Sequence, residues 1–229
     1  MNIMTWNTAL TEGSNAKGVI EYVKEYLDKK DSIAVLQQIP YKIPDEICGW
    51  RSPIEDPVYT RLIGTFSEDK YKIFQNKNYN NGCIRMSTII VTQMVCVEET
   101  NIPTTNREAT IQIKDSYSIY GLHARAGEDN EAYLNELKKF ESADIVLGDF
   151  NAGDYSRCEN RSVFREILKD YVCICNMPTK EIGDNGRIDR RSCIDHVFIK
   201  NNIVDRCSSL VIHEDINISD HYPISFCIE

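Results

Sequence analysis

The order of apolar and polar positions predicts a strand, a helix and a second strand at the start of the chain. Apolar residues at positions 1, 3, 4 and 6 are typical of a strand over residues 1–6. Residues 14–30 carry an apolar stripe with helical spacing, and Ser14 or Asn15 is suited to cap that helix. The short apolar run 32–37 then predicts a buried strand. The helical stripe consists of Val19, Ile20, Val23, Tyr26 and Leu27.

Residues 40–82 show the weakest periodicity in the chain. They contain four prolines and many polar residues, so we interpret them as a long loop-rich insertion with one short strand near residues 59–66. Long loops in compact domains usually shape a site. We therefore expect this insertion to border a functional site.

From residue 84 onward, segments rich in β-forming residues dominate. Residues 84–99, 109–114 and 116–123 are separated by turn residues, which predicts a meander. Helices and strands are mixed without a repeated βαβ spacing, and this favours an α/β (α+β) fold with a two-sheet core flanked by helices. The remaining predicted elements are helices over residues 130–142 and 161–170, and strands over residues 143–151, 193–200, 208–213 and 221–229.

Length and charge limit the classes of protein that fit this pattern. The chain of 229 residues suits a single domain, residues 1–229, and its 42% hydrophobic content is enough for a substantial core. Lys and Arg total 26 against 35 Asp and Glu, a net charge of -9, so the surface as a whole repels phosphate backbones and anionic membranes. A polyanionic substrate must therefore be met locally, by a metal ion or a small arginine cluster.

Nine cysteines are scattered along the chain, and their number is odd. No CxxC pair occurs, and Cys173 and Cys175 have the spacing of one strand face, so we expect reduced thiols in a cytoplasmic protein. The first residues lack a basic leader, and no run of 18 apolar residues occurs. We expect no contact with a membrane, no obligate protein partner and a monomeric chain.

Polar side chains that bind metals or transfer protons follow the apolar strands. The ends in question are residues 6–7, 36–38, 121–123, 147–151 and 219–221, and a sixth group, residues 194–196, opens a strand. Strand ends are where a rigid scaffold presents side chains to a cleft. The sequence therefore predicts one composite site.

Six short motifs follow one another between residues 6 and 223. In chain order they are "WN", "LQ" before an expected acid, "GLH", "GDFN", "IDHVFI" and "SDHYPI". In this order they resemble the endonuclease/exonuclease/phosphatase superfamily, which has the deoxyribonuclease I-like fold. The resemblance implies a four-layered α/β sandwich, with two central, mostly antiparallel sheets covered by helices. It also implies cleavage of a phosphoester with a divalent metal, Mg²⁺ or Mn²⁺.

The resemblance also assigns roles to individual residues. It places the metal site on Asn7, Gln38 and Asp220, and it gives Asp149 and Asn151 the nucleophilic water or a second ion. It implies that Asp195 and His221 act as a catalytic pair. It also gives His123 the task of binding and neutralising the scissile phosphate, where the abasic-site endonuclease branch has a tyrosine. His196 follows Asp195 directly, so strand alternation points it to the opposite face and predicts a structural role.

Gln38 departs from the family's pattern, which expects a metal-binding glutamate at this position. A glutamine has nearly the same shape but lacks the anionic oxygen that a hard cation favours, so we expect metal binding and activity to be lost or weakened. Three explanations stay open: a deliberate inactivating substitution, a natural inactive relative, and a natural variant that binds metal through the amide.

Arginines are further candidates for substrate binding. Arg125 follows His123 by two residues, and Arg187 and Arg190 lie in a polar stretch that we interpret as a loop before Asp195. The planar guanidinium matches phosphate geometry, although an ordinary solvated loop has the same composition.

The combined pattern predicts a metal-dependent phosphodiesterase or nuclease acting on a nucleic acid or nucleotide. The alternatives are a phosphatase of small phosphorylated compounds and a catalytically inactive relative that binds a phosphate ligand. The net charge of -9 favours a short, single-stranded or small nucleotide substrate over a long duplex.

Overall fold

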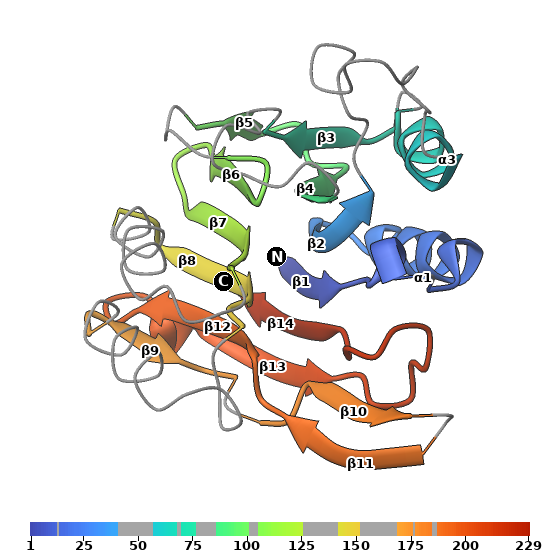
Figure 1. Ribbon diagram of the computed structural model, residues 1–229. Helices are drawn as coiled ribbons and strands as arrows, with labels where there is room; N and C mark the ends of the chain where they lie inside the picture. Colours follow the sequence, from blue (N-terminus) through green and yellow to red (C-terminus); the bar gives the residue numbers. More distant parts are fainter. Residues whose placement is uncertain are drawn as a thin grey trace.

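The computed structural model shows two six-stranded β-sheets stacked face to face (Figure 1). It describes residues 1–12, 14–40, 57–67, 70–76, 86–100, 105–125, 142–151, 169–175, 177–184 and 187–229, except for the side chains of residues 182, 184 and 187–190. The helices are α1 (Ala16–Leu27) and α3 (Pro57–Phe66), with short 3-10 helices η1 (Leu10–Glu12) and η2 (Val204–Arg206). The α/β sandwich predicted from the sequence is confirmed.

The first sheet has the strand order β13-β14-β1-β2-β4-β3. Its strands are β1 (Asn2–Asn7), β2 (Ser32–Pro40), β3 (Lys72–Gln75), β4 (Met86–Thr92), β13 (Cys207–Ile212) and β14 (Ile224–Ile228). Within the described strands, β1 and β2 form its parallel pair and the other neighbours are antiparallel. Helices α1 and α3 cover the outer face of this sheet (Figure 1).

The second sheet has the order β5-β6-β7-β8-β12-β9. Its strands are β5 (Val97–Glu99), β6 (Glu108–Ile113), β7 (Ser118–His123), β8 (Ile145–Asp149), β9 (Tyr171–Cys173) and β12 (Asp195–Lys200). Here β7 and β8 are parallel, and the other described pairings are antiparallel. The helices predicted over residues 130–142 and 161–170 lie almost wholly outside the described residues, so a helical layer on this sheet stays a prediction.

The core between the sheets comes from alternate residues of the strands. Ile33 and Val35 of β2 face the second sheet, whereas Ala34 and Leu36 face α1. The two sheets approach each other closely at Gly121 of β7, where an added Cβ atom would lie 2.2 Å from Cγ1 of Val35. A side chain at this position would therefore force the sheets apart.

Helix α1 confirms the predicted amphipathic stripe. Asn15 is its N-cap, and its side-chain oxygen accepts a hydrogen bond from the backbone N–H of Gly18 at 3.1 Å. The five predicted core residues are the buried residues of the helix: Val19, Ile20, Val23, Tyr26 and Leu27.

Three predictions about secondary structure were wrong. Residues 59–66 belong to helix α3 and not to a strand, because Leu62 and Phe66, spaced by one helical turn, are buried against the first sheet. Strands β4 and β5 lie in different sheets, so the expected meander runs only from β5 to β7. The segment expected to be a polar loop forms β11 (Arg187–Ser192), which pairs with β10 (Lys180–Asp184) in a two-stranded sheet.

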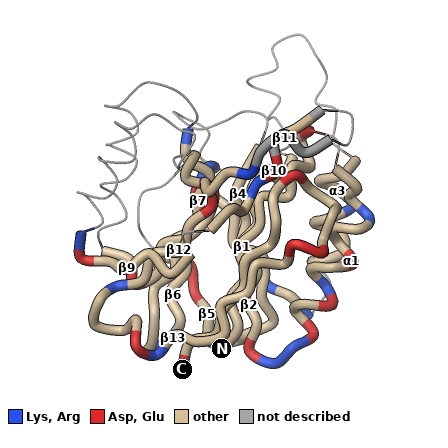
Figure 2. The backbone as a smooth tube through the Cα atoms, turned by 90° about the horizontal axis from the view of Figure 1, so that it is seen from below, with Lys and Arg blue, Asp and Glu red and all other residues tan. Residues whose placement is uncertain are grey.

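The described cysteines have free thiols. No helix in the described part of the chain is long and apolar enough to cross a membrane. The chain termini lie together at one end of the sandwich, whereas β10 and β11 lie at the other (Figure 2).

Candidate active site

The sheet topology brings the predicted polar strand ends to one edge of the sandwich. Parallel β7 and β8 end together, so His123 pairs with Asp149 in the backbone register. On its other side β8 pairs with antiparallel β12, which begins where β8 ends, so Asp149 also lies opposite Asp195 in the sheet. Asn7 ends β1, next to the Gln37–Gln38 segment of its parallel neighbour β2. Asn7 and His221, 214 positions apart in sequence, thus come within 3.4 Å of each other, measured from Nδ2 to Nε2.

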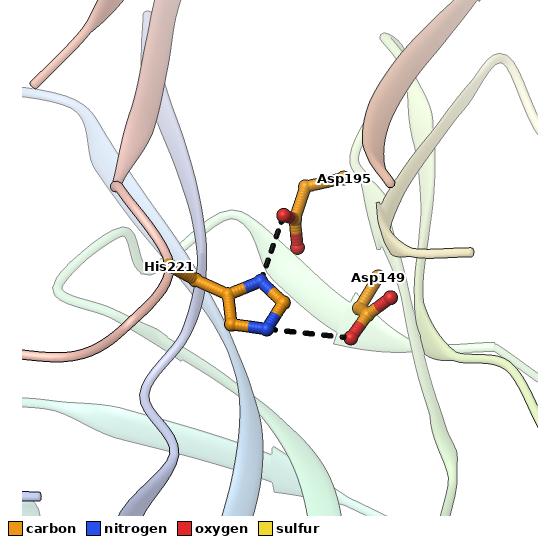
Figure 3. Close-up of side chains that lie close together, drawn as sticks. All are labelled: Asp149, Asp195 and His221. Atoms are coloured by element: carbon orange, nitrogen blue, oxygen red, sulfur yellow. Dashed lines mark hydrogen bonds and ion pairs between the residues drawn. The ribbon is translucent and has the colours of Figure 1, made fainter. Parts of the chain in front are cut away.

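Asp195 and His221 form a buried hydrogen-bonded pair (Figure 3). Nδ1 of His221 lies 2.8 Å from Oδ2 of Asp195, and the hydroxyl of Thr179 donates to the same oxygen at 2.7 Å. Burial alone would lower the pKa of His221, but the carboxylates of Asp195 and Asp149 together outweigh it, and the pKa is raised. The pair therefore holds the imidazole in one orientation, with Nε2 facing Asp149 at 3.9 Å.

Asp149 lies at the centre of the site and is almost fully buried. Its Oδ2 accepts a hydrogen bond from Nδ2 of Asn7 at 2.8 Å, and its Oδ1 accepts one from the backbone N–H of Asn151 at 2.8 Å. Burial, followed by the charge of Asp195, raises the pKa of Asp149 to about 6. At neutral pH the side chain is a carboxylate that readily takes up a proton.

Asn7 and Asn151 hold this carboxylate in place. The Oδ1 atom of Asn7 accepts a hydrogen bond from the backbone N–H of Ala9 at 3.1 Å, which points its amide nitrogen at Asp149. The side chain of Asn151 donates to the carbonyl of Ala124 at 2.8 Å. The structure therefore brings both asparagines to the site as expected.

His123 is buried 3.6 Å from Asp149, measured from Nε2 to Oδ2. Burial, with a smaller effect of the nearby Arg107 guanidinium, lowers the pKa of His123 to about 3. The imidazole is neutral at physiological pH, so it can donate a hydrogen bond to a phosphate but does not supply the neutralising charge that the resemblance implies. That charge must come from other groups.

Lys180, at the start of β10, supplies such a charge. Its Nζ atom lies 2.9 Å from Nε2 of His221 and 2.9 Å from Oδ2 of Asp220. Burial lowers its pKa, but the carboxylates of Asp220, Asp149 and Asp195 together outweigh burial and raise it, so the ammonium is charged. Asp220, expected to be a metal ligand, is thus ion-paired with Lys180. Sequence reasoning missed Lys180 because a backbone bridge to His221, 41 residues away, brings it to the site.

Gln38 reaches the site through an irregularity in β2. The pairing with β4 shifts between Leu36 and Ile39, and Gln38 has a φ of 55°. Its Oε1 accepts a hydrogen bond from the hydroxyl of Thr11, and its Nε2 donates to Oε1 of Glu12, both at 3.3 Å. The other glutamine, Gln37, is fully buried and donates to the hydroxyl of Thr5.

These residues border one open pocket with a volume of about 460 Å³. Arg125 lines it as expected, and Arg107, Lys180 and Glu12 are further lining residues that sequence reasoning did not single out. Arg187 and Arg190 lie on the neighbouring strand β11, but their side chains are outside the description. The full lining is Glu12, Gln38, Met86, Arg107, His123, Ala124, Arg125, Asp149, Asn151 and Lys180.

His196 packs away from this pocket, as strand alternation predicts. Its ring lies against Phe150 and Phe198, and its Nδ1 atom is 3.2 Å from the carbonyl oxygen of Cys175. The structural role expected for His196 agrees with these contacts.

The residues of the site fit a divalent cation. Asp149, Asp195 and His221 each offer a ligand atom within 4.8 Å of the others, which makes them the candidate metal-binding group found in the described part of the chain. The hydrogen bond between Asp195 and His221 occupies two of those atoms. The pocket itself adds the carboxylate of Glu12, and a hard oxygen donor of this kind suits Mg²⁺ or Mn²⁺.

Comparison with known proteins gives matches at the level of structure. No model of a protein family matches the sequence, and no curated protein sequence matches it. The endonuclease domain of TRAS1, a telomere-specific non-LTR retrotransposon, has 18% identity and a TM-score of 0.69, covering 100% of this chain and 98% of that one. The 3'-5' exonuclease NExo from Neisseria meningitidis has 14% identity and a TM-score of 0.71, covering 100% of both chains.

An endonuclease/exonuclease/phosphatase family protein from Leptotrichia buccalis is also similar, with 16% identity, a TM-score of 0.64, and 100% and 99% of the two chains covered. At such identities, structural likeness establishes the fold and leaves the activity to be argued from the site. The chain therefore has the deoxyribonuclease I-like fold of the endonuclease/exonuclease/phosphatase structures, as its motifs implied.

Proposed function

We propose that the protein is a divalent-metal-dependent phosphodiesterase or nuclease that hydrolyses a phosphoester bond of a nucleic acid or nucleotide. The observation that carries this proposal is that three kinds of group meet in one place. Asp149 accepts a hydrogen bond from Asn7, and the Asp195–His221 pair is in turn contacted by Lys180. Hydrolysis of a phosphoester needs a positioned water, a proton acceptor and positive charge at the phosphate. This group of side chains can meet the first two needs and part of the third.

Each side chain has a role that follows from its environment. Asp149, oriented by Asn7 and ionised at neutral pH, accepts the proton of the attacking water. The ammonium of Lys180 binds a non-bridging oxygen of the phosphate, and His221, fixed by Asp195, donates to another from Nε2 when its ring is protonated. A divalent cation, when bound, supplies the remaining positive charge. Neutral His123 donates a hydrogen bond.

The likeness to the structures supports a nucleic acid as the substrate. By their titles, the TRAS1 domain is an endonuclease and NExo is a 3'-5' exonuclease. The net charge of -9 favours short or single-stranded substrates, because long duplexes are repelled by the rest of the surface. We further propose that residues 1–229 act as one domain and as a cytoplasmic monomer.

The test is cleavage of labelled single-stranded and duplex oligonucleotides with Mg²⁺, with Mn²⁺ and with a chelator. We expect metal-dependent cleavage by the wild-type chain that falls on the order of 100-fold or more in D149N and H221A. The control is E25Q, which removes a charge on the exposed face of α1. Failure to cleave any oligonucleotide, or cleavage by D149N at the wild-type rate, would contradict the proposal.

A second candidate is a phosphatase of small phosphorylated compounds. The pocket of about 460 Å³, bordered by Arg107, Arg125 and Lys180, is large enough for one phosphorylated metabolite and offers three cations to it. Release of inorganic phosphate from nucleotides and inositol phosphates, measured beside the oligonucleotides, distinguishes the two functions. Phosphate release without oligonucleotide cleavage would favour the phosphatase.

A further inference from the structure

The described residues place a carboxylate next to the position where the family's pattern has lost one. Glu12 ends the short helix η1, which follows the site strand β1, and its side chain lines the same pocket as Gln38 and Asp149. Its Oε1 atom accepts a hydrogen bond from Nε2 of Gln38 at 3.3 Å. Position 38 of β2 therefore lacks the expected carboxylate, but the carboxylate of Glu12 lies next to it, hydrogen-bonded to Gln38.

The amide of Gln38 is oriented to make this contact. Its oxygen is engaged by the hydroxyl of Thr11 at 3.3 Å, so its NH₂ group faces Glu12. A glutamate at position 38 would instead bring two carboxylates to this distance, where they repel each other without a cation between them. Glutamine at position 38 and glutamate at position 12 thus form a matched pair.

The backbone supports the same interpretation. Gln38 has a φ of 55°, in the left-handed region that residues other than glycine seldom adopt. Such conformations persist where the surrounding structure demands a particular side-chain direction. Here the direction points the amide of a 7% exposed residue at Glu12.

We propose that the carboxylate of Glu12, held by the amide of Gln38, is a ligand of the divalent cation and replaces the glutamate expected at position 38. A cation such as Mg²⁺ is commonly held by only one or two carboxylates together with water and substrate oxygens, so Glu12 suffices as its carboxylate ligand, and Asp149 stays free to accept the proton of the attacking water. Gln38 then acts as a positioning residue that orients the ligand, in the way outer hydrogen bonds orient metal ligands. This inference rests on the metal dependence proposed above.

The test measures Mn²⁺ binding directly, by the electron paramagnetic resonance signal of the free ion, in the full chain without substrate. The variants are E12Q, the exchange variant E12Q/Q38E, D149N and the control E25Q. We expect E12Q to weaken Mn²⁺ binding on the order of 10- to 100-fold, and the exchange variant to return it toward the wild-type value because one carboxylate and one amide are again present. E25Q, with the same loss of charge outside the pocket, binds like the wild type.

The outcomes separate this inference from the proposed function. If D149N loses Mn²⁺ binding but E12Q keeps the wild-type affinity, Glu12 is not a ligand and this inference fails while the metal dependence stands. An exchange variant as weak as E12Q also contradicts the inference. If the wild-type chain binds no Mn²⁺ at millimolar concentration, both the metal dependence and this inference are overturned.

Discussion

The Nζ atom of Lys180 lies 2.9 Å from the Nε2 atom of His221, and the same ammonium is 2.9 Å from a carboxylate oxygen of Asp220. A charged ammonium at this distance disfavours a second positive charge on the imidazole. In this arrangement, Nε2 of His221 accepts a hydrogen bond from Lys180, while Nδ1 donates to Asp195. Lys180 therefore keeps a positive charge beside the histidine and lowers the pKa of the imidazole.

The first prediction concerns the K180M variant. Removal of the ammonium should raise the pKa of His221, because the charge that lowers it is lost, and should reduce kcat/KM on the order of 100-fold. Proton NMR titration of the histidine ring, assigned with H221Q, measures the pKa. The matched control is K200M on β12, where the lysine pairs with Asp144 at 3.3 Å. An unchanged His221 pKa in K180M would contradict this role.

The second prediction is that Asp195 and His221 act as one unit. The 2.8 Å hydrogen bond between them fixes the imidazole, so D195N and H221A should each lower the turnover of oligonucleotide cleavage by a similar factor. The double variant should then lose little more than the worse single variant. Steady-state kinetics of the three variants provide the measurement. Losses that multiply in the double variant would show that the two residues contribute independently.

The third prediction is a pH dependence of stability without metal. The pKa of Asp149 is raised to about 6 from its ordinary value of 3.8. This gives stability that is present below pH 4 and is lost as pH rises through about 6. The amide of D149N does not titrate, so this variant does not lose stability in the same way. The unfolding free energy of D149N minus that of the wild type should therefore be larger at pH 8 than at pH 5, by roughly 1 kcal/mol. Urea unfolding in a chelator at both pH values measures the difference. A difference that stays constant with pH would contradict the burial of a raised-pKa carboxylate.

Local patterns in the sequence were sufficient to predict much of this fold. The stripe of α1 is predictable because the five buried residues and the cap lie within 13 consecutive positions. The strands are similarly visible as runs of β-branched residues. Helix α3 was missed because Val58, Leu62 and Phe66, one turn apart, lie in a proline-rich segment whose β-branched and aromatic residues also suit a strand.

Long-range partners were beyond prediction from local patterns. Nothing in the residues between β4 and β5 indicates that the chain passes from one sheet to the other there. The motif residues Asn7, Asp149, Asp195 and His221 were predictable because each follows or opens an apolar strand. Lys180 and Glu12 have no such local signal, since the first reaches the site through a bridge to His221 and the second through a bond to Gln38.

The fourth prediction tests how tightly the two sheets pack. In G121A the new methyl group would lie 2.2 Å from Cγ1 of Val35, so the variant should lose roughly 1–3 kcal/mol of unfolding free energy. V35A removes the opposing atom but leaves a cavity, so it also lowers the unfolding free energy. The double variant G121A/V35A should lose less unfolding free energy than the sum of the losses of the two single variants. Chemical unfolding of the three variants measures this coupling. Strict additivity would mean that the two positions do not meet.

The fifth prediction concerns Q38E, the substitution that restores the expected family residue. It places a second carboxylate where an amide now lies 3.3 Å from Glu12, so the variant should have a lower melting temperature than the wild type in a chelator. Mn²⁺ should then stabilise Q38E more than it stabilises the wild type, because two carboxylates bind the cation more strongly than one.

The same variant also tests the role of Glu12 in cleavage. If Glu12 already serves as a ligand, the gain of Q38E in metal-dependent cleavage over the wild type stays below about tenfold, or about 1.4 kcal/mol of transition-state stabilisation. A gain of ~100-fold or more would instead mean that the wild-type site lacks a ligand, as the sequence motif alone implies. Thermal unfolding with and without Mn²⁺, together with cleavage rates of Q38E and E12Q/Q38E, distinguishes the two cases, because only in the first does the exchange variant match the wild type.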